Sequence, residues 1–407
     1  MKSKFNIADF YILLFVINES SGYLNTNGRI GVIALMIIIL ISIYSAYEVL
    51  NKNIGGRYFK ALSILMIMFI IYGLALLLSG ETNYVTHNDF LAVDNSVYLK
   101  LILKSLLPIY TFYVFSLKGL ITEEKLRIWI AVFFVSVSFS FFTNRQTALE
   151  LAMERGGTFT EEATTNASYL ILGLLPCLVL FRNKRILFFS GLGYCVFLTM
   201  LGMKRGAIII GLFCLLFLLI SELKITNRKI KFRVILSTIS FLAITFYFLR
   251  AQFSNSDYFL YQINRTMDGD ASSRGVLYVD LIDHFFYNAN IFQVLFGMGA
   301  DGTLKVVDNY AHNDWLEILT NQGAIGFLIY VNYWVCLFKE WKNSKKNHDA
   351  YMAISLFVII FFMKTLFSMS YNTIPYYSSI ILGFYMSKVH TLNKQTISTY
   401  ENTAYYK

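Results

Sequence analysis

The sequence repeatedly contains apolar runs of about 18 to 22 residues, long enough for a helix to cross roughly 30 Å of hydrocarbon. Runs such as IGVIALMIIILISIYSAY, starting at residue 30, carry apolar side chains on every helical face. They lack the alternation of a membrane β-barrel strand. Charged residues make up 15% of the chain, against roughly 25% in a soluble globular protein. We therefore predict an all-α, polytopic integral membrane protein.

Windows of about 19 residues predict about twelve transmembrane helices. Their ranges are 6–22, 30–50, 59–79, 98–117, 126–143, 166–181, 186–202, 206–221, 232–250, 315–338, 350–368 and 373–390. They divide the chain into four parts: helices 1 to 9 within 1–250, a large external loop with helical segments at 251–314, helices 10 to 12 within 315–390, and a cytoplasmic tail at 391–407.

Lysine and arginine are unevenly distributed between alternate loops. If the N-terminus is cytoplasmic, 23 of them lie in inside segments and nine in outside segments. This distribution follows the positive-inside rule and predicts that both termini are cytoplasmic. Topology thus explains the net charge of +10, and we expect no nucleic-acid partner. The outside loops are long and mixed in composition, so we expect the functional site on the outer side of the membrane.

Six of the arginines predicted on the outside, where the positive-inside bias disfavours them, are candidate site residues: Arg145, Arg155, Arg205, Arg250, Arg265 and Arg274. A guanidinium binds phosphate in a bidentate way and keeps its charge in a low-dielectric setting. Any one arginine alone fits a snorkelling helix end or a salt bridge to a loop acid. Six together favour an anion-binding surface, and Lys204 in GMKRGAIII is a further substrate-binding candidate.

His312 lies just before a predicted span, in AHNDWLEIL. A neutral imidazole there is able to accept a proton from a hydroxyl near pH 7. Asn313, also a substrate-binding candidate, suits the N-cap of a helix that Asp314 and Glu317 begin, where both acids are favourable against the helix dipole. A purely structural histidine at a helix start is the alternative.

The remaining polar and sulfur-containing residues predict neither a metal site nor a cofactor. The four cysteines sit in apolar runs without a CxxC pair, and the histidines lack ligand spacing. FGMGADG (296–302) lacks the context of a phosphate loop and predicts a tight turn. Glu48 and Lys364 are expected to snorkel from span ends. Lys104 is expected in a buried pair or a cavity.

Three segments together carry a family resemblance. AHNDWLEILTNQGAIGFLIYV, with His-Asn-x-x-Leu-Glu and then Gly-x-x-Gly before a span, resembles the O-antigen ligase/polymerase superfamily. KRGAIII is similar to the Ser-Arg-Gly-Ala step of that family, and SSRGVLYVD followed by LFGMGADG is similar to its segment upstream of the histidine. These motifs cover about 200–335, and the rest agrees only in hydropathy. Lys204 departs from the serine of many members.

The resemblance implies a membrane glycosyltransferase with the C-type architecture, inverting and independent of metal, that uses undecaprenyl-diphosphate-linked glycan. Arg205 and Arg274 would hold the diphosphate and His312 would face the acceptor. The enzyme would act at the outer face of a bacterial inner membrane, where a chain-length regulator and a flippase are expected partners. The other four outside arginines match no motif position.

Four functions stay open at this point. The Ile-, Asn-, Lys-, Phe- and Tyr-rich composition favours a polymerase of surface polysaccharide, such as O-antigen or capsule, over a ligase that moves finished polymer to lipid A core or protein. A flippase or sugar transporter would suit the helix number and the buried charges, but an external loop of 64 residues favours catalysis. A membrane scaffold is the fourth alternative.

Overall fold

The computed structural model describes residues 5–21, 29–79, 95–154, 161–202, 204–225, 243, 247, 274–307 and 309–404, and every regular element in them is a helix. The N-terminal elements are α1 (Ile7–Ser21), α2 (Arg29–Asn51), α3 (Gly56–Leu78), α4 (Asn95–Leu117), α5 (Glu123–Glu154), α6 (Glu161–Leu172), α7 (Leu175–Leu178), η1 (Val179–Phe181), α8 (Arg185–Leu201) and α9 (Arg205–Ile225). The C-terminal elements are α12 (Arg274–Asp283), the π-helix η2 (His284–Asn288), α13 (Ile291–Phe296), α14 (Thr303–Val307), α15 (Asp314–Asn343), η3 (Ser344–Lys346), α16 (His348–Phe367) and α17 (Tyr376–Ala404). The prediction of an all-α chain is confirmed for this part.

Six helices in the described ranges are long and apolar enough to cross a membrane. They are Arg29–Asn51, Gly56–Leu78, Val97–Leu117, Glu123–Thr143, Arg205–Lys224 and His348–Phe367, with shorter apolar helices at Ala167–Phe181 and Arg185–Leu201. Large apolar side chains such as Leu40 and Val135 point outward from them, as lipid-facing residues do. The number of twelve spans stays a prediction, and the expected span at 232–250 lies outside the described residues except for 243 and 247.

Three expected spans belong to helices that differ in detail from the expectation. In the span expected at 166–181, a turn at Gly173 and the missing N–H of Pro176 interrupt the helical hydrogen bonds between α6 and α7, although the apolar helical run continues over Ala167–Phe181. The span expected at 126–143 agrees with the apolar helix Glu123–Thr143, and the helix continues beyond it as α5 to Glu154. The span expected at 315–338 is interrupted at Gly323, whose φ of 67° and ψ of −169° are not helical.

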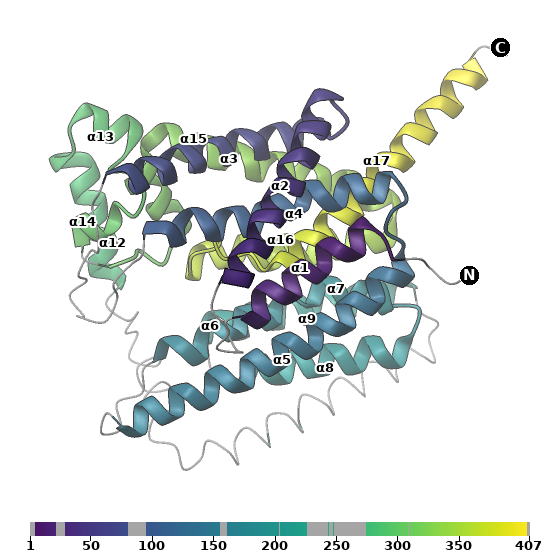
Figure 1. The fold of residues 1–407 in the computed structure, drawn as a ribbon, viewed down its shortest axis with the longest axis horizontal. Helices are drawn as coiled ribbons and strands as arrows, with labels where there is room; N and C mark the ends of the chain where they lie inside the picture. Colours follow the sequence, from purple (N-terminus) through teal and green to yellow (C-terminus); the bar gives the residue numbers. More distant parts are fainter. Residues whose placement is uncertain are drawn as a thin grey trace.

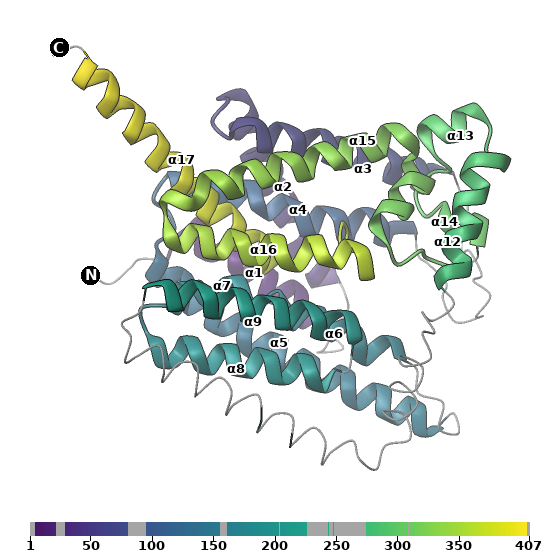
Figure 2. The ribbon, with the colours of Figure 1, turned by 180° about the vertical axis from the view of Figure 1, so that it is seen from behind.

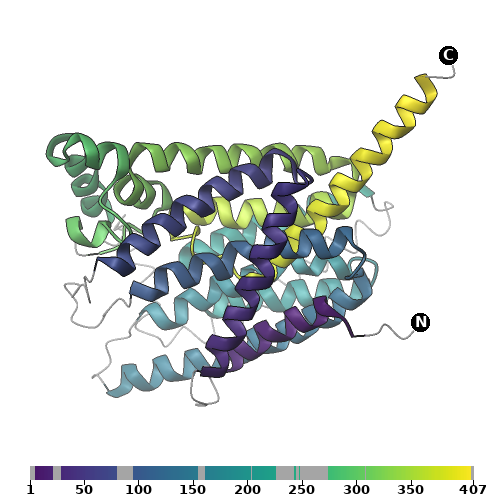
Figure 3. The same cartoon turned by 45° about the horizontal axis from the view of Figure 1, so that its top comes forward.

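The long helices run mostly along one direction of the molecule, and α2 crosses them steeply (Figure 1). Residues 274–307, from α12 to α14, gather at one end of this bundle, and we call them the headpiece (Figures 1 and 2). The beginning of α1 and the C-terminal part of α17 lie at the opposite end (Figure 3). The described part of the predicted external loop is thus a compact, mostly helical unit at one end.

Helices α4 and α17 form the most extensive helix pair of the bundle. Small residues line this contact on α17: Ser379, Gly383 and Ser387 recur every fourth position. A Cβ on Gly383 would lie 2.3 Å from the carbonyl oxygen of Ile109, so only glycine allows this approach. Ser379 donates to the carbonyl of Ser105 on α4. Close packing of small residues is the usual way that helices associate in lipid, where no hydrophobic effect drives them together.

Ion pairs hold the end of the bundle opposite the headpiece. Lys125 of α5 lies 2.7 Å from Asp9 of α1, which also accepts from the Trp129 indole at 3.0 Å. Glu48 of α2 lies 2.6 Å from Lys118, beyond α4, and pairs with Lys52 as well. The expectation that Glu48 snorkels is wrong, because its carboxylate is buried between two ammonium groups.

Two glycine-containing turns, one at 297–299 and one at Gly323, pack against each other and join the headpiece to the bundle. Met298 and Gly299 donate their backbone N–H groups to the carbonyls of Thr320 (2.8 Å) and Asn321 (3.0 Å) of α15. A Cβ on Gly323 would lie 2.5 Å from the backbone nitrogen of Gly297, and both glycines have positive φ. The prediction that FGMGADG forms a tight turn is confirmed, and the turn fits the break in α15.

Candidate functional site

His312 occupies a strained position directly before α15. Its φ of 52° lies in the left-handed region, which non-glycine residues adopt at an energetic cost and which is frequent at functional sites. Its neighbours fix it there. The Ala311 N–H donates to the Glu317 carboxylate at 2.6 Å, and the Asn313 side chain accepts from the N–H groups of Trp315 and Leu316. The predicted N-cap role of Asn313 is confirmed, and its role in substrate binding stays a prediction.

Arg274 begins α12 in the headpiece. Its Nη1 donates to the carbonyl oxygen of Phe367 at 3.1 Å. Phe367 is the last residue of α16, so the guanidinium meets the negative end of that helix dipole. This bond directs the Arg274 side chain from the headpiece toward the bundle.

The beginning of α9 reaches the same place. A Cβ on Gly206 would lie 2.7 Å from the Tyr169 hydroxyl and 3.1 Å from the Phe367 Cβ. The glycine of the KRGA step therefore lets α9 start directly against Phe367. Arg205, the first residue of α9, and Lys204 before it are thereby placed beside the end of α16.

Lys364 adds a fourth cation that was not a predicted site residue. Its side chain projects from α16, is 3% exposed, and donates to the Thr373 hydroxyl at 2.5 Å. The ammonium lies 4.9 Å from the centre of the Tyr169 ring and interacts electrostatically with Lys204. The expectation that Lys364 snorkels is therefore wrong. We call Lys204, Arg205, Arg274 and Lys364 the cationic cluster.

Two members of the cationic cluster, Arg274 and Lys204, influence the protonation of His312. Burial, then the charges of Arg274 and Lys204, lower the pKa of His312 from 6.5 to about 4. The imidazole is therefore neutral at pH 7 and accepts a hydrogen bond through one ring nitrogen. Three residues chosen from the sequence, Lys204, Arg274 and His312, are thus close enough in space to interact electrostatically.

Two buried acids, Asp314 and Glu317, hold the backbone on either side of His312 through hydrogen bonds. This structural role was not predicted. Asp314 accepts from the backbone N–H groups of Ser370 (2.7 Å) and Tyr371 (3.1 Å), which ties the segment before α17 to the start of α15. Glu317, besides its bond from Ala311, accepts from the Thr303 hydroxyl at 2.8 Å in the headpiece. In the sequence, both acids stand at the start of an apolar run, where their favourable position against the helix dipole is a sufficient explanation.

The structure leaves other predicted site residues undescribed. Arg145 lies on α5, but its side chain is not described, and Arg155, Arg250 and Arg265 lie outside the described residues. Their roles in substrate binding stay predictions. Within the described ranges, no three His, Cys, Asp or Glu side chains are grouped as metal ligands. The four cysteines are buried and free.

A comparison of the chain with known protein families and with curated proteins finds no match.

Proposed function

We propose that this protein is a membrane glycosyltransferase that polymerises repeat units of a surface polysaccharide. It transfers the growing glycan from undecaprenyl diphosphate to the next lipid-linked unit at the outer face of the inner membrane. The observation that carries the proposal is the convergence of Lys204 and Arg274 on a neutral His312 beside the end of α16. These residues lie in the segments that resemble the O-antigen ligase/polymerase superfamily.

The reaction needs cations where the sugar leaves. When the bond between the anomeric carbon and the diphosphate breaks, negative charge builds up on the departing oxygen. Fixed guanidinium and ammonium groups in a partly buried site stabilise that charge without reorganisation. In the proposed mechanism, Arg205 and Arg274 hold the diphosphate, and Lys204 and Lys364 add positive charge around it.

His312 acts on the acceptor. The acceptor hydroxyl attacks the anomeric carbon from the face opposite the diphosphate, which inverts the configuration. As the new C–O bond forms, the bond to the diphosphate breaks, and the hydroxyl proton passes through water to the departing diphosphate oxygen. A neutral imidazole accepts a hydrogen bond from that hydroxyl and aims its lone pair. Because the pKa of His312 is about 4, we assign it to orienting the hydroxyl rather than to holding the proton.

The finer architecture belongs to the same proposal. About twelve spans, a C-type arrangement, cytoplasmic termini and a headpiece on the outer side are consistent with the charge distribution of the loops and with the resemblance. Lipid-linked oligosaccharide is the substrate, and a chain-length regulator and a flippase are the membrane proteins expected to act with it.

The proposal is tested by complementing a deletion strain and resolving its surface polysaccharide on a gel. We expect wild type to restore a ladder of chain lengths, and Arg274→Ala to abolish it at an unchanged protein level. Losing one such cation costs roughly 10² to 10³ in rate, and Arg274→Lys should recover only a fraction. Arg29→Ala, which removes an exposed arginine at the start of α2, is the matched control and should keep the ladder.

Other outcomes select among the alternatives. Long lipid-linked polymer that never reaches its acceptor would identify a ligase. Lipid-linked units that accumulate on the inner leaflet would identify a flippase. A ladder of normal length in Arg274→Ala would contradict the proposed role of the cationic cluster.

A further inference from the structure

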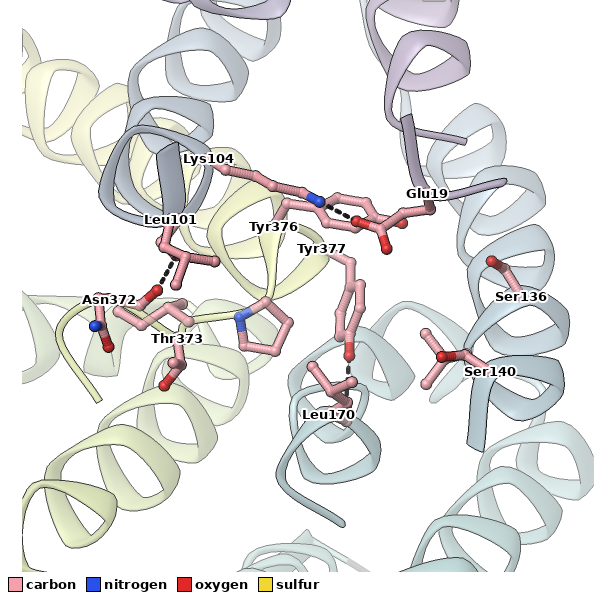
Figure 4. Close-up of a pocket in the computed structure, with 14 residues that line it drawn as sticks. Glu19, Leu101, Lys104, Ser136, Ser140, Leu170, Asn372, Thr373, Tyr376 and Tyr377 are labelled. Carbon is pink, nitrogen blue, oxygen red and sulfur yellow. Dashed lines mark hydrogen bonds and ion pairs between the residues drawn. The ribbon is translucent and has the colours of Figure 1, made fainter. Parts of the chain in front are cut away.

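A cavity of about 260 Å³ lies close to the cationic cluster, between α1, α4, α5, α6 and the segment leading into α17 (Figure 4). Most of its wall is apolar, and six polar side chains stand in it: Glu19, Lys104, Ser136, Ser140, Thr373 and Tyr376. Figure 4 shows Lys104 and Glu19 pointing toward one another from α4 and α1, with both serines across from them on α5.

The Lys104–Glu19 ion pair at this cavity is open, in the sense that both side chains are partly exposed. Lys104 Nζ donates to Glu19 Oε1, and the two side chains are still 21% and 31% exposed. The Lys125–Asp9 pair, which also joins α1 to the bundle, is 11% and 8% exposed. The open pair therefore presents hydrogen-bonding groups to whatever fills the cavity.

The wall of the cavity is held in place by the surrounding protein. The Tyr376 ring stacks on Phe15 with centroids 4.4 Å apart, and the Lys104 ammonium lies 5.9 Å from the Tyr376 ring centre. The Tyr377 hydroxyl donates to the carbonyl oxygen of Leu170 at 2.5 Å. A wall already fixed by packing and hydrogen bonds loses little conformational entropy when a ligand binds.

One segment connects the cavity with the candidate site. Thr373 lines the cavity and accepts the hydrogen bond from Lys364 of the cationic cluster. Ser370 and Tyr371 of the same segment are bound to Asp314, two residues after His312. A substrate held at the cationic cluster therefore has this cavity within its immediate surroundings.

We propose that this cavity is a carbohydrate subsite that binds one sugar residue of the glycan substrate. Glu19 accepts and Lys104 donates hydrogen bonds to ring hydroxyls, and the hydroxyls of Ser136 and Ser140 add further partners. This inference rests on the proposed function, because it supplies the glycan as the substrate.

The charged pair favours a sugar over the isoprenoid part of a lipid-linked glycan, because an isoprenoid chain would cover both charges without offering them a hydrogen bond. The apolar part of the lining suits the C–H faces of a sugar ring. A phosphate group would meet the like charge of Glu19. The volume lies just below the range of about 300 to 1,000 Å³ for pockets of drug-sized ligands, which suits a single hydrophilic ring.

Cysteine modification tests the subsite in the full-length membrane protein. Ser136→Cys introduces a thiol at the cavity wall, and Val135→Cys places one on the neighbouring face of α5, where Val135 is 72% exposed. A charged methanethiosulfonate reacts with thiolates in contact with water. We expect it to modify Ser136→Cys, whose thiol would face the cavity, and to spare Val135→Cys, whose thiol would face lipid rather than water. The background should be low because the native cysteines are buried.

Ligand protection then identifies the occupant. A panel of methyl glycosides should include one that slows modification of Ser136→Cys several-fold, whereas farnesyl diphosphate should not. Glu19→Gln with Lys104→Met in the Ser136→Cys background removes both charges together, which avoids an unpaired buried charge, and should abolish the protection. Asp9→Asn, at the closed pair, should leave protection unchanged, and size-exclusion elution checks that each variant is folded.

Several results would overturn the subsite. They are an unreactive Ser136→Cys, a modification rate that no glycoside changes, protection by farnesyl diphosphate instead, or protection that survives loss of the ion pair. The proposed function fails separately. Failure of the wild type to restore a ladder in the deletion strain would reject the polymerase without altering the protection measurement, and absence of protection would leave the complementation result intact.

Discussion

At the scale of single residues, the environment of His312 keeps its imidazole neutral at pH 7. Burial and the charges of Arg274 and Lys204 lower its pKa to about 4, below the usual 6.5. Removing one of these charges should raise the pKa. We expect the His312 ring signal to titrate near pH 4 in an NMR experiment on ¹³C-histidine-labelled protein, and at a higher pH in Arg274→Ala. His312→Gln assigns the signal, and a wild-type titration near 6.5 would contradict the described environment.

Asp301 gives a second prediction at this scale. Burial raises the pKa of this headpiece carboxyl from 3.8 to about 6. Between these values the folded state binds more protons than the unfolded state, so stability falls as pH rises through this window. Above pH 6 the cost is at most about 3 kcal/mol. Asparagine also tolerates the left-handed backbone there, where φ is 55°.

Asp301→Asn should therefore raise the apparent unfolding temperature at pH 7.5, where the wild-type carboxyl is ionised, and change it little at pH 4. Thermal unfolding of both proteins in the same detergent at the two pH values measures this difference. A stabilisation of equal size at both pH values would show that ionisation of Asp301 is not the cause.

At the scale of elements, the contact between the headpiece and α15 depends on two glycines. Gly323→Ala would place a Cβ 2.5 Å from the backbone of Gly297 and require a positive φ of 67° from alanine. The backbone strain alone costs about 1 to 3 kcal/mol, because a φ of 67° with a ψ of −169° is a conformation that essentially only glycine adopts, and the steric clash adds to it. We expect faster proteolysis in 296–302 and a lower unfolding temperature.

Gly299→Ala separates the two contributions to this cost. Gly299 has a φ of 99°, but nothing lies within 4 Å of a Cβ placed there, so this variant carries only the backbone strain. Its effect on the unfolding temperature should be the smaller one. Equal effects of the two substitutions would show that the close approach of Gly297 and Gly323 does not hold the headpiece.

At the scale of the whole molecule, the predicted sidedness has a direct test. Asn309 lies next to the headpiece and Lys345 lies at the opposite end, and both are exposed. In spheroplasts, a membrane-impermeant maleimide should label Asn309→Cys at once and Lys345→Cys only after lysis. The native cysteines are buried, so the chain without an introduced cysteine should show only a low background of labelling. The reverse pattern would place the cationic cluster on the cytoplasmic side and reject the proposed reaction.

The helical class and most helix positions were predictable from the sequence, because the length and polarity of an apolar run are local properties. The breaks at Gly173 and Gly323 were not, since a glycine within an apolar run is also tolerated in an unbroken helix. Gly323 takes its conformation because the turn at Gly297 packs against it, far away in the chain.

The same division holds for the candidate site. From the sequence alone, His312, Arg205 and Arg274 could be chosen as candidate site residues, because their neighbours form recognisable motifs and because arginine is disfavoured in loops on the outer side of the membrane. Only the tertiary structure decided that Lys364 joins the cationic cluster, that Glu317 positions the loop before His312, and that Lys104 shares a cavity with Glu19. The reason is physical: a motif is a property of adjacent residues, whereas a buried charge acquires its role from partners that helix packing brings to it.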